Sequence, residues 1–143
     1  MPKLTVLMGA PGSGKSTYAK GTGAHVVTTD TGRARGQSPG EILHNAYREI
    51  NAALAAGKNV VFDTTGANPA VRKAAATIAQ KHGAQLAARV IDAPVGACLQ
   101  AQQGRTKPVA AADVRRIHDA VQRQARGLKA EGFKDISVVR NRR

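Results

Sequence analysis

The sequence predicts an α/β fold in which a parallel sheet of about five strands is flanked by helices. Short apolar runs alternate along the chain with longer stretches that repeat apolar residues at helical spacing, and strands separated by helices form parallel sheets with crossover connections. A glycine-rich segment at 9–16 stands directly between the first apolar run and the first helical stretch, where a tight turn is required. Because the chain has 143 residues, we expect a single domain that spans 1–143.

Five segments have the β-branched and apolar character of strands. They are 3–8, 25–28, 59–63, 85–91 and 136–139. Acidic residues end or closely follow three of these segments, at Asp30, Asp63 and Asp92. The carboxyl ends of parallel strands meet at one edge of a sheet, and ligands bind at that edge. We therefore expect these acids and the glycine-rich segment to gather there.

Five stretches are expected to form helices, and capping residues mark several of their ends. The stretches are 15–21, 39–56, 69–82, 94–103 and 113–129. Ser38 and Glu41 form a capping box around Pro39, which suits the first helical position. Asn68 is expected to cap the third helix, and Gly57 ends the second.

The glycine-rich segment matches the phosphate-binding pattern G-x-x-x-x-G-K-[ST] in full. The expected nucleotide-binding residues are those of the loop and the residue after it: Gly9, Ala10, Pro11, Gly12, Ser13, Gly14, Lys15, Ser16 and Thr17. The glycines allow backbone N–H groups to turn toward phosphate oxygens, Lys15 is expected to reach the β- and γ-phosphates, and the Ser16 hydroxyl is expected to ligate Mg²⁺. The sequence therefore predicts a site for ATP, or another nucleoside triphosphate, with Mg²⁺.

Four further residues are candidates for chemistry beside this loop. Asp30 is placed to accept the proton of an attacking hydroxyl, and Arg33 to hold a phosphate of the acceptor, although a turn residue and a solvated arginine explain both positions equally well. Asp63 ends a buried-type strand and is expected to hold Mg²⁺, directly or through water, rather than only to cap the following turn. Arg105 lies in the basic connection 104–111, which is expected to close over the triphosphate as a small lid, with an exposed basic loop as the alternative.

The net charge of +13 is distributed unevenly, because residues 72–143 contribute +10 and residues 1–71 contribute +3. A charge of this size favours a polyanionic partner such as nucleic acid, and a solvated surface that aids solubility is the alternative. In the expected helix 113–129, basic residues share the side opposite the apolar residues, which suits contact with nucleic-acid phosphates or simple solvation. These residues are Arg115, Arg116, Arg123, Arg126 and Lys129.

The remaining composition excludes several classes of protein. Cys98 is the only cysteine, so the chain has no internal disulfide. The four histidines show no metal-ligand spacing. No apolar run is long enough to span a membrane and no signal peptide is visible, so we expect a cytoplasmic protein.

Taken in order, these motifs resemble the small P-loop kinases, and most closely the kinase domain of phage polynucleotide 5′-kinases. The matching segments are 9–17, Asp30-x-x-Arg33, Asp63-Thr64-Thr65 with Asn68-Pro69 and Arg72, Asp92-x-Pro94, and Arg105 ahead of Asp113-Val114. The chain departs from the family pattern at Thr65, where an asparagine is usual, and in the residues that surround Arg105.

The resemblance implies transfer of the γ-phosphate of ATP to the 5′-hydroxyl end of DNA or RNA, as in nucleic acid repair, in the host cytoplasm if the protein is encoded by a phage. It implies catalytic roles for Lys15, Arg33 and Arg105, with Asp30 as the general base. The implied acceptor-binding residues are Asp30, Arg33, Asp63, Thr65 and Arg72. Two alternatives stay open: a small-molecule kinase of the same fold, and a non-catalytic nucleic-acid binder that responds to nucleotide.

Overall fold

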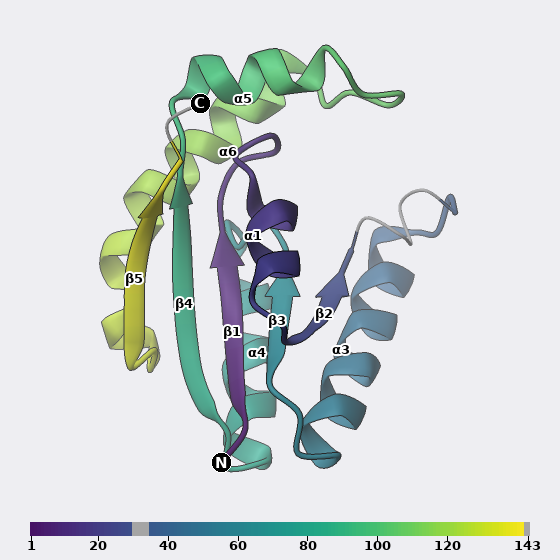
Figure 1. Ribbon diagram of the computed structural model, residues 1–143, viewed down its shortest axis with the longest axis vertical. Coiled ribbons are helices and arrows are strands. Elements are labelled where there is room, and N and C mark those ends of the chain that lie inside the picture. Colours follow the sequence, from purple (N-terminus) through teal and green to yellow (C-terminus); the bar gives the residue numbers. More distant parts are fainter. Residues whose placement is uncertain (30–34, 142–143) are drawn as a thin grey trace.

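The computed structural model describes residues 1–29 and 35–141 and contains a parallel sheet with helices on both faces (Figure 1). Within the described residues, five strands are ordered β2-β3-β1-β4-β5, and every neighbouring pair is parallel. The strands are β1 (Lys3–Met8), β2 (His25–Thr28), β3 (Val60–Asp63), β4 (Gln85–Asp92) and β5 (Asp135–Arg140). The predicted fold class is confirmed. Strand β4 ends one residue later than predicted and β5 extends one residue further at each end, because Ala87 pairs with Asp135 and Asp92 pairs with Arg140, whereas β3 begins one residue later than predicted.

Helices connect the strands close to the positions that the sequence predicts. They are α1 (Lys15–Gly21), α3 (Pro39–Ala55), α4 (Pro69–Lys81), α5 (Val95–Gln102) and α6 (Ala111–Gln124). The capping box is formed, because Ser38 Oγ accepts from the Glu41 N–H and the Glu41 carboxylate accepts from the Ser38 N–H. Asn68 Oδ1 accepts from the Ala70 N–H at the start of α4, as predicted.

The helix that the sequence predicts at 113–129 differs from the observed one at both ends. It begins two residues earlier, at Ala111, and its α-helical part stops at Gln124. Two 3₁₀ turns follow, Ala125–Gly127 and Lys129–Glu131. Gly127 is a poor helix former, and Leu128 and Phe133 are both buried in the main core, so the chain tightens there against the sheet.

The main core lies on one face of the sheet, beneath α3, α4, the second half of α6 and the residues that follow it. Helix α1 covers the other face through a smaller cluster that contains Leu7, Ala19 and Val61. Helix α5 crosses above the carboxyl ends of β4 and β1, and the loop after it extends further over that edge (Figure 1). The fold therefore places the glycine-rich loop between the start of α1 and the underside of α5.

An ionic network attaches the edge strand β5 to the rest of the sheet. Asp135 Oδ2 accepts from Arg89 Nη2 at 2.9 Å and from Lys3 Nζ at 2.8 Å, which joins β5 to β4 and β1. The Arg89 guanidinium, with help from Lys3, lowers the pKa of Asp135 to about 2. The carboxylate is therefore charged at neutral pH, and this edge of the sheet holds its register by charge as well as by the backbone ladder.

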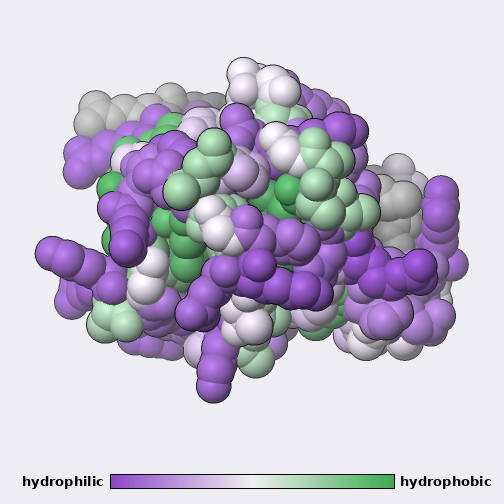
Figure 2. Space-filling model, turned by 90° about the horizontal axis from the view of Figure 1, so that it is seen from below, coloured by the Kyte–Doolittle hydropathy of each residue, from purple (hydrophilic) through white to green (hydrophobic). Residues whose placement is uncertain are grey.

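The end of the molecule where the strands begin, away from α5, has a mostly hydrophilic surface with small hydrophobic patches between hydrophilic residues (Figure 2). Among the described residues, no helix combines the length and the hydropathy needed to cross a membrane.

Candidate active site

The glycine-rich loop has a backbone that only glycine adopts easily at two of its positions. Gly12 and Gly14 have φ angles of +85° and +98°, in the region that L side chains rarely occupy. A Cβ atom at Gly12 would also come within 2.6 Å of the carbonyl oxygen of Cys98 in α5. The two glycines therefore let the loop turn tightly beneath α5, in the type of turn that binds phosphate through backbone N–H groups.

The β3 strand delivers Asp63 to this loop. Asp63 is 5% exposed, and its Oδ2 accepts a hydrogen bond of 2.8 Å from the Ser16 hydroxyl at the start of α1. Because the hydroxyl donates its hydrogen to the carboxylate, its lone pairs stay free for a cation. A hydroxyl and one carboxylate oxygen are hard ligands that suit Mg²⁺, which takes few protein ligands and completes its shell with phosphates and water.

The described residues contain no group of three or more histidine, cysteine, aspartate or glutamate side chains that could hold a metal ion by themselves.

One open pocket of about 240 Å³ joins the loop to several other segments. The loop and α1 form one wall, Thr29 and the turn after β3 form the second, and the end of α5 with the following loop forms the third. The lining residues are Pro11, Gly12, Gly14, Lys15, Ser16, Thr17, Thr29, Asp63, Thr64, Thr65, Ala101 and Arg105. The structure thus brings together Lys15, Ser16, Asp63, Thr65 and Arg105 of the sequence-predicted site.

Three loop residues of the prediction, Gly9, Ala10 and Ser13, support the loop without lining this pocket. Gly9 N donates to Thr65 O at 3.0 Å, and Ser13 N donates to Ala10 O at 3.1 Å. Two predicted residues, Asp30 and Arg33, lie outside the described residues.

Arg72, expected to bind the acceptor, lies elsewhere. It is 2% exposed and shares the core-facing side of α4 with Ala75 and Ala79. Its Nε and Nη2 donate to the Glu131 carboxylate at 2.8 and 2.9 Å, and its Nη1 donates to Gly66 O at 2.6 Å and to Gln124 Oε1 at 2.7 Å. Four of its five N–H donors are thus used by protein groups, and Arg72 supports the turn after β3 instead of lining the pocket.

A residue that the sequence reasoning missed, Gln102, holds the base of the lid loop (residues 103–110). Its Oε1 accepts from the Val109 N–H at 3.0 Å, and its backbone carbonyl accepts from the Arg105 N–H at 3.1 Å. Gln102 is 4% exposed, and its Nε2 has no hydrogen-bond partner among the described residues. One signal was available, because Gln102 lies one helical turn after the buried Cys98 and therefore on the same side of α5.

Cys98 has a packing role rather than a chemical one. It is buried beside Gly12, and burial raises the pKa of its thiol. The thiol is therefore protonated and unreactive at neutral pH.

The comparisons with known proteins agree with this geometry. A family model described as an AAA domain (AAA_33) matches residues 4–129. No curated protein sequence matches the chain. Among solved structures, a chain of the Pnkp1/Rnl/Hen1 RNA repair complex has a TM-score of 0.75 at 24% identity, over 87% of this chain and 45% of that one. This chain thus spans less than half of that relative.

Two further structures cover nearly the full length of both chains. A putative kinase from Chloroflexus aurantiacus J-10-fl has a TM-score of 0.70 at 13% identity, over 97% of this chain and 88% of that one. The APS kinase CysC of Mycobacterium tuberculosis, solved with AMPPNP and APS, has a TM-score of 0.55 at 19% identity, over 99% and 88%. The family match covers most of the sequence, so the chain belongs to the AAA_33 family and has a nucleotide-binding P-loop kinase fold.

Proposed function

We propose that the protein is a kinase that transfers the γ-phosphate of ATP to the 5′-hydroxyl end of DNA or RNA. The observation that carries the transfer chemistry is the single pocket in which Lys15, the Ser16–Asp63 pair and Arg105 meet. Phosphoryl transfer needs little beyond positioning and the neutralisation of charge on the phosphate oxygens. These residues supply both from three separate segments of the chain.

In the proposed reaction, each described residue has a defined role. The loop N–H groups and Lys15 bind the β- and γ-phosphates, and Arg105 neutralises the charge that develops on the transferred group. Ser16 and Asp63 would hold Mg²⁺ together with the phosphates, and the ion would supply further positive charge at the same oxygens. Thr65, on the opposite rim, is positioned to contact the acceptor.

The resemblance supplies the remaining roles. Asp30 accepts the proton of the 5′-hydroxyl while the hydroxyl oxygen forms a bond to the γ-phosphorus. The bond from that phosphorus to the bridging oxygen of the β-phosphate breaks, and ADP is released. Arg33 holds a phosphate of the acceptor. We do not carry Arg72 into the proposal as an acceptor contact, because its guanidinium is occupied by Glu131, Gln124 and Gly66.

The positive charge of the chain is the main support for a nucleic-acid acceptor. The net charge of +13, most of it in residues 72–143, favours polyanions over neutral metabolites. The similarity to a chain of an RNA repair complex points in the same direction.

A small-molecule kinase is the second candidate, and a specific observation favours it. The match to the APS kinase covers 88% of that enzyme, whereas the match to the repair-complex chain covers 45% of that chain. The fold of this chain therefore accounts for nearly all of that small-molecule kinase.

The test is a transfer assay with γ-labelled ATP. Single-stranded DNA and RNA 20-mers with 5′-hydroxyl ends are compared with the same oligonucleotides already phosphorylated at the 5′ end, and with a metabolite panel that includes adenosine 5′-phosphosulfate. The Lys15→Ala variant, purified in parallel, controls for contaminating kinases. The proposal expects label only on the 5′-hydroxyl oligonucleotides. Label on a metabolite would establish the second candidate, and binding of ATP and oligonucleotide without transfer would contradict both.

A further inference from the structure

Five basic side chains line the outer side of α6 and of the 3₁₀ turns that follow it. We call this set the basic stripe: Arg115, Arg116, Arg123, Arg126 and Lys129, all of them exposed. The opposite side of the same segment is anchored in the core by the buried residues Val114, Val121 and Leu128. At about 1.5 Å of rise per residue, the stripe extends over roughly 20 Å of rigid surface.

The acidic side chains in 72–143 leave most of the positive charge of the basic stripe uncompensated. Glu131 is bound to the buried Arg72, and Asp135 to Arg89 and Lys3. Asp92 accepts from Gln122. Within the stripe, the one ion pair among the described residues joins Arg116 to Asp113 at 3.3 Å, and Asp119 adds a single negative charge between Arg115 and Arg123 at helical spacing.

The chemistry of the stripe identifies the kind of partner. Its apolar side is packed in the core, and the large exposed hydrophobic residues of the described chain, which are Met1, Ile136 and Val138, lie outside it. A helix that binds a membrane surface needs an apolar side free to enter the lipid, so an anionic bilayer is a poor fit. The stripe also contains no aromatic residue that could stack on a base. What remains is contact with backbone phosphates, independent of base sequence.

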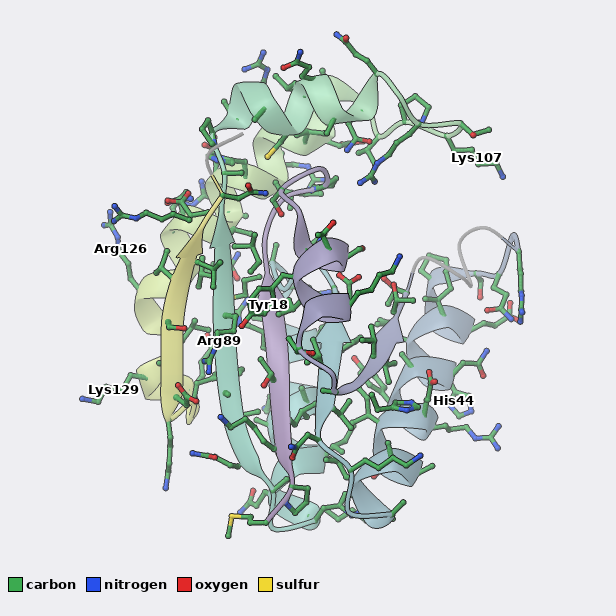
Figure 3. All side chains as sticks on the ribbon, in the orientation of Figure 1. Tyr18, His44, Arg89, Lys107, Arg126 and Lys129 are labelled. Carbon is green, nitrogen blue, oxygen red and sulfur yellow. The ribbon has the colours of Figure 1, made fainter. Side chains whose placement is uncertain are left out.

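The position of the stripe determines which acceptors reach it. Helix α6 begins where the lid loop ends, so basic residues continue along the chain from Arg105 and Lys107 into the stripe. Figure 3 shows Lys107 at the far end of the lid loop, whereas Arg126 and Lys129 extend outward on the opposite side of the molecule, beside β5. An acceptor of one or two nucleotides seated in the pocket therefore cannot contact the far half of the stripe.

We propose that the basic stripe binds the phosphate backbone of a polynucleotide whose 5′ end occupies the pocket, so that acceptor affinity rises with acceptor length. This inference rests on the proposed function and adds where the body of the acceptor lies. It requires affinity that is independent of base sequence and that falls steeply with salt.

The test uses the full chain with the double variant Arg123→Gln/Arg126→Gln, which neutralises two charges in the far half of the stripe. The matched control is Lys58→Gln/Lys81→Gln, which makes the same change in net charge at two exposed positions outside the stripe. For a 5′-hydroxyl 20-mer, the stripe variant should raise KM by about tenfold with kcat unchanged, and the salt slope of log K should fall by about 1.4, or 0.7 for each lost phosphate contact. For a nucleoside 3′-phosphate acceptor, KM should not change.

Equal effects of the two double variants, or an equal rise in KM for the short acceptor, would overturn the inference. Binding of a fluorescent 20-mer is measured in the same salt series without ATP, so the stripe is tested even if no transfer occurs. Transfer with an unchanged salt slope would reject the stripe alone, whereas a reduced slope without transfer would support the stripe and reject the kinase. Loss of binding to phosphatidylserine vesicles, with oligonucleotide binding unaltered, would also reject the proposal.

Discussion

Two sides of the pocket, the phosphate-loop side and the lid side, are built by different means. On the phosphate-loop side, the shape depends mainly on the backbone. Gly12 and Gly14 form the turn, and a hydrogen bond of 2.8 Å joins the Ser16 hydroxyl to the buried Asp63 carboxylate. On the lid side, the exposed Arg105 belongs to a loop whose base depends on the side chain of Gln102. The first side is held by glycine backbone geometry and a hydrogen bond to a buried carboxylate, whereas the second is an exposed loop held at its base by one side chain, as we expect of a lid.

The comparison predicts how mutations should divide between the two sides. Changes on the phosphate-loop side should affect nucleotide and metal together. Changes on the lid side should reduce the rate of transfer while nucleotide binding persists. Changes to buried residues that support the pocket without lining it, such as Arg72, should lower stability and leave the activity of the folded protein intact.

The largest effect is expected for Asp63→Asn on the phosphate-loop side. The amide keeps the shape and can still accept from Ser16, but it removes the negative charge that favours Mg²⁺. We expect kcat to fall by about 100-fold to 1,000-fold, the range seen when one preorganised electrostatic group is lost, with a higher Mg²⁺ requirement. The measurement is a Mg²⁺ titration of transfer activity, and an unchanged titration would show that Asp63 only caps the turn.

The next effect is expected for Arg105→Ala in the lid. We expect kcat to fall by about 100-fold while the Kd for ATP changes little, because the arginine acts mainly on charge that develops during transfer. Lys107→Ala is the matched control in the same loop and should change kcat by less than about threefold, since Lys107 does not line the pocket. Similar losses in both variants would mean that the lid contributes general positive charge and no specific contact.

A smaller effect, on stability, is expected for Arg72→Met behind the turn after β3. The variant leaves Gly66 O without its buried donor, while the partly exposed Glu131 regains water, so we expect a loss of about 2 kcal/mol in the free energy of unfolding. Denaturant unfolding measures this loss, and kcat per folded molecule should stay near the wild-type value. A raised acceptor KM without a loss of stability would instead restore Arg72 as an acceptor contact.

The smallest effect is expected for Gln102→Met, which keeps the volume of the side chain and removes both polar atoms. Because Gln102 is a positioning residue for Arg105, its substitution should lower kcat by about fivefold, which corresponds to the free energy of one ordinary hydrogen bond. The same change in the Arg105→Ala background should have almost no further effect on kcat.

Two readouts separate this role from a structural one. Hydrogen exchange at the Val109 amide should accelerate in Gln102→Met and stay unchanged in the control Gln103→Met, which alters the exposed neighbour. If the kinetic effects of Gln102→Met and Arg105→Ala simply add, Gln102 acts on overall stability and not through Arg105.

The same contrast explains what the sequence could predict. The five strands and the phosphate loop follow from local patterns, because glycine at Gly12 and Gly14, the capping box at Ser38 and the apolar strand runs each have one dominant structural meaning. The position of Asp63 could also be predicted, since an acid at the carboxyl end of a buried parallel strand lies at the edge of the sheet where ligands bind.

The roles of Arg72 and Gln102 depend on contacts between distant segments. Arg72 meets Glu131 across 59 residues, and no local pattern indicates that pairing. Gln102 bonds to a backbone group seven residues away, but whether it faces solvent or the phosphate loop is decided by how α5 packs on the loop. For a polar residue near a motif, the sequence therefore indicates that the residue lies close to the site. Only the packing of the fold decides whether its side chain contacts a ligand or holds another part of the protein in place.

The proposed function requires this pocket to transfer the γ-phosphate of ATP to a polynucleotide end. A competition in one reaction tests this transfer: a 5′-hydroxyl 20-mer and adenosine 5′-phosphosulfate are supplied at equal concentration with γ-labelled ATP, and Arg105→Ala is assayed in parallel. Nearly all the label should appear on the oligonucleotide, should be removed by a phosphatase specific for end groups, and should largely disappear in the variant. Label on the small acceptor, or on inorganic phosphate alone, would show that the pocket does not act on polynucleotide ends.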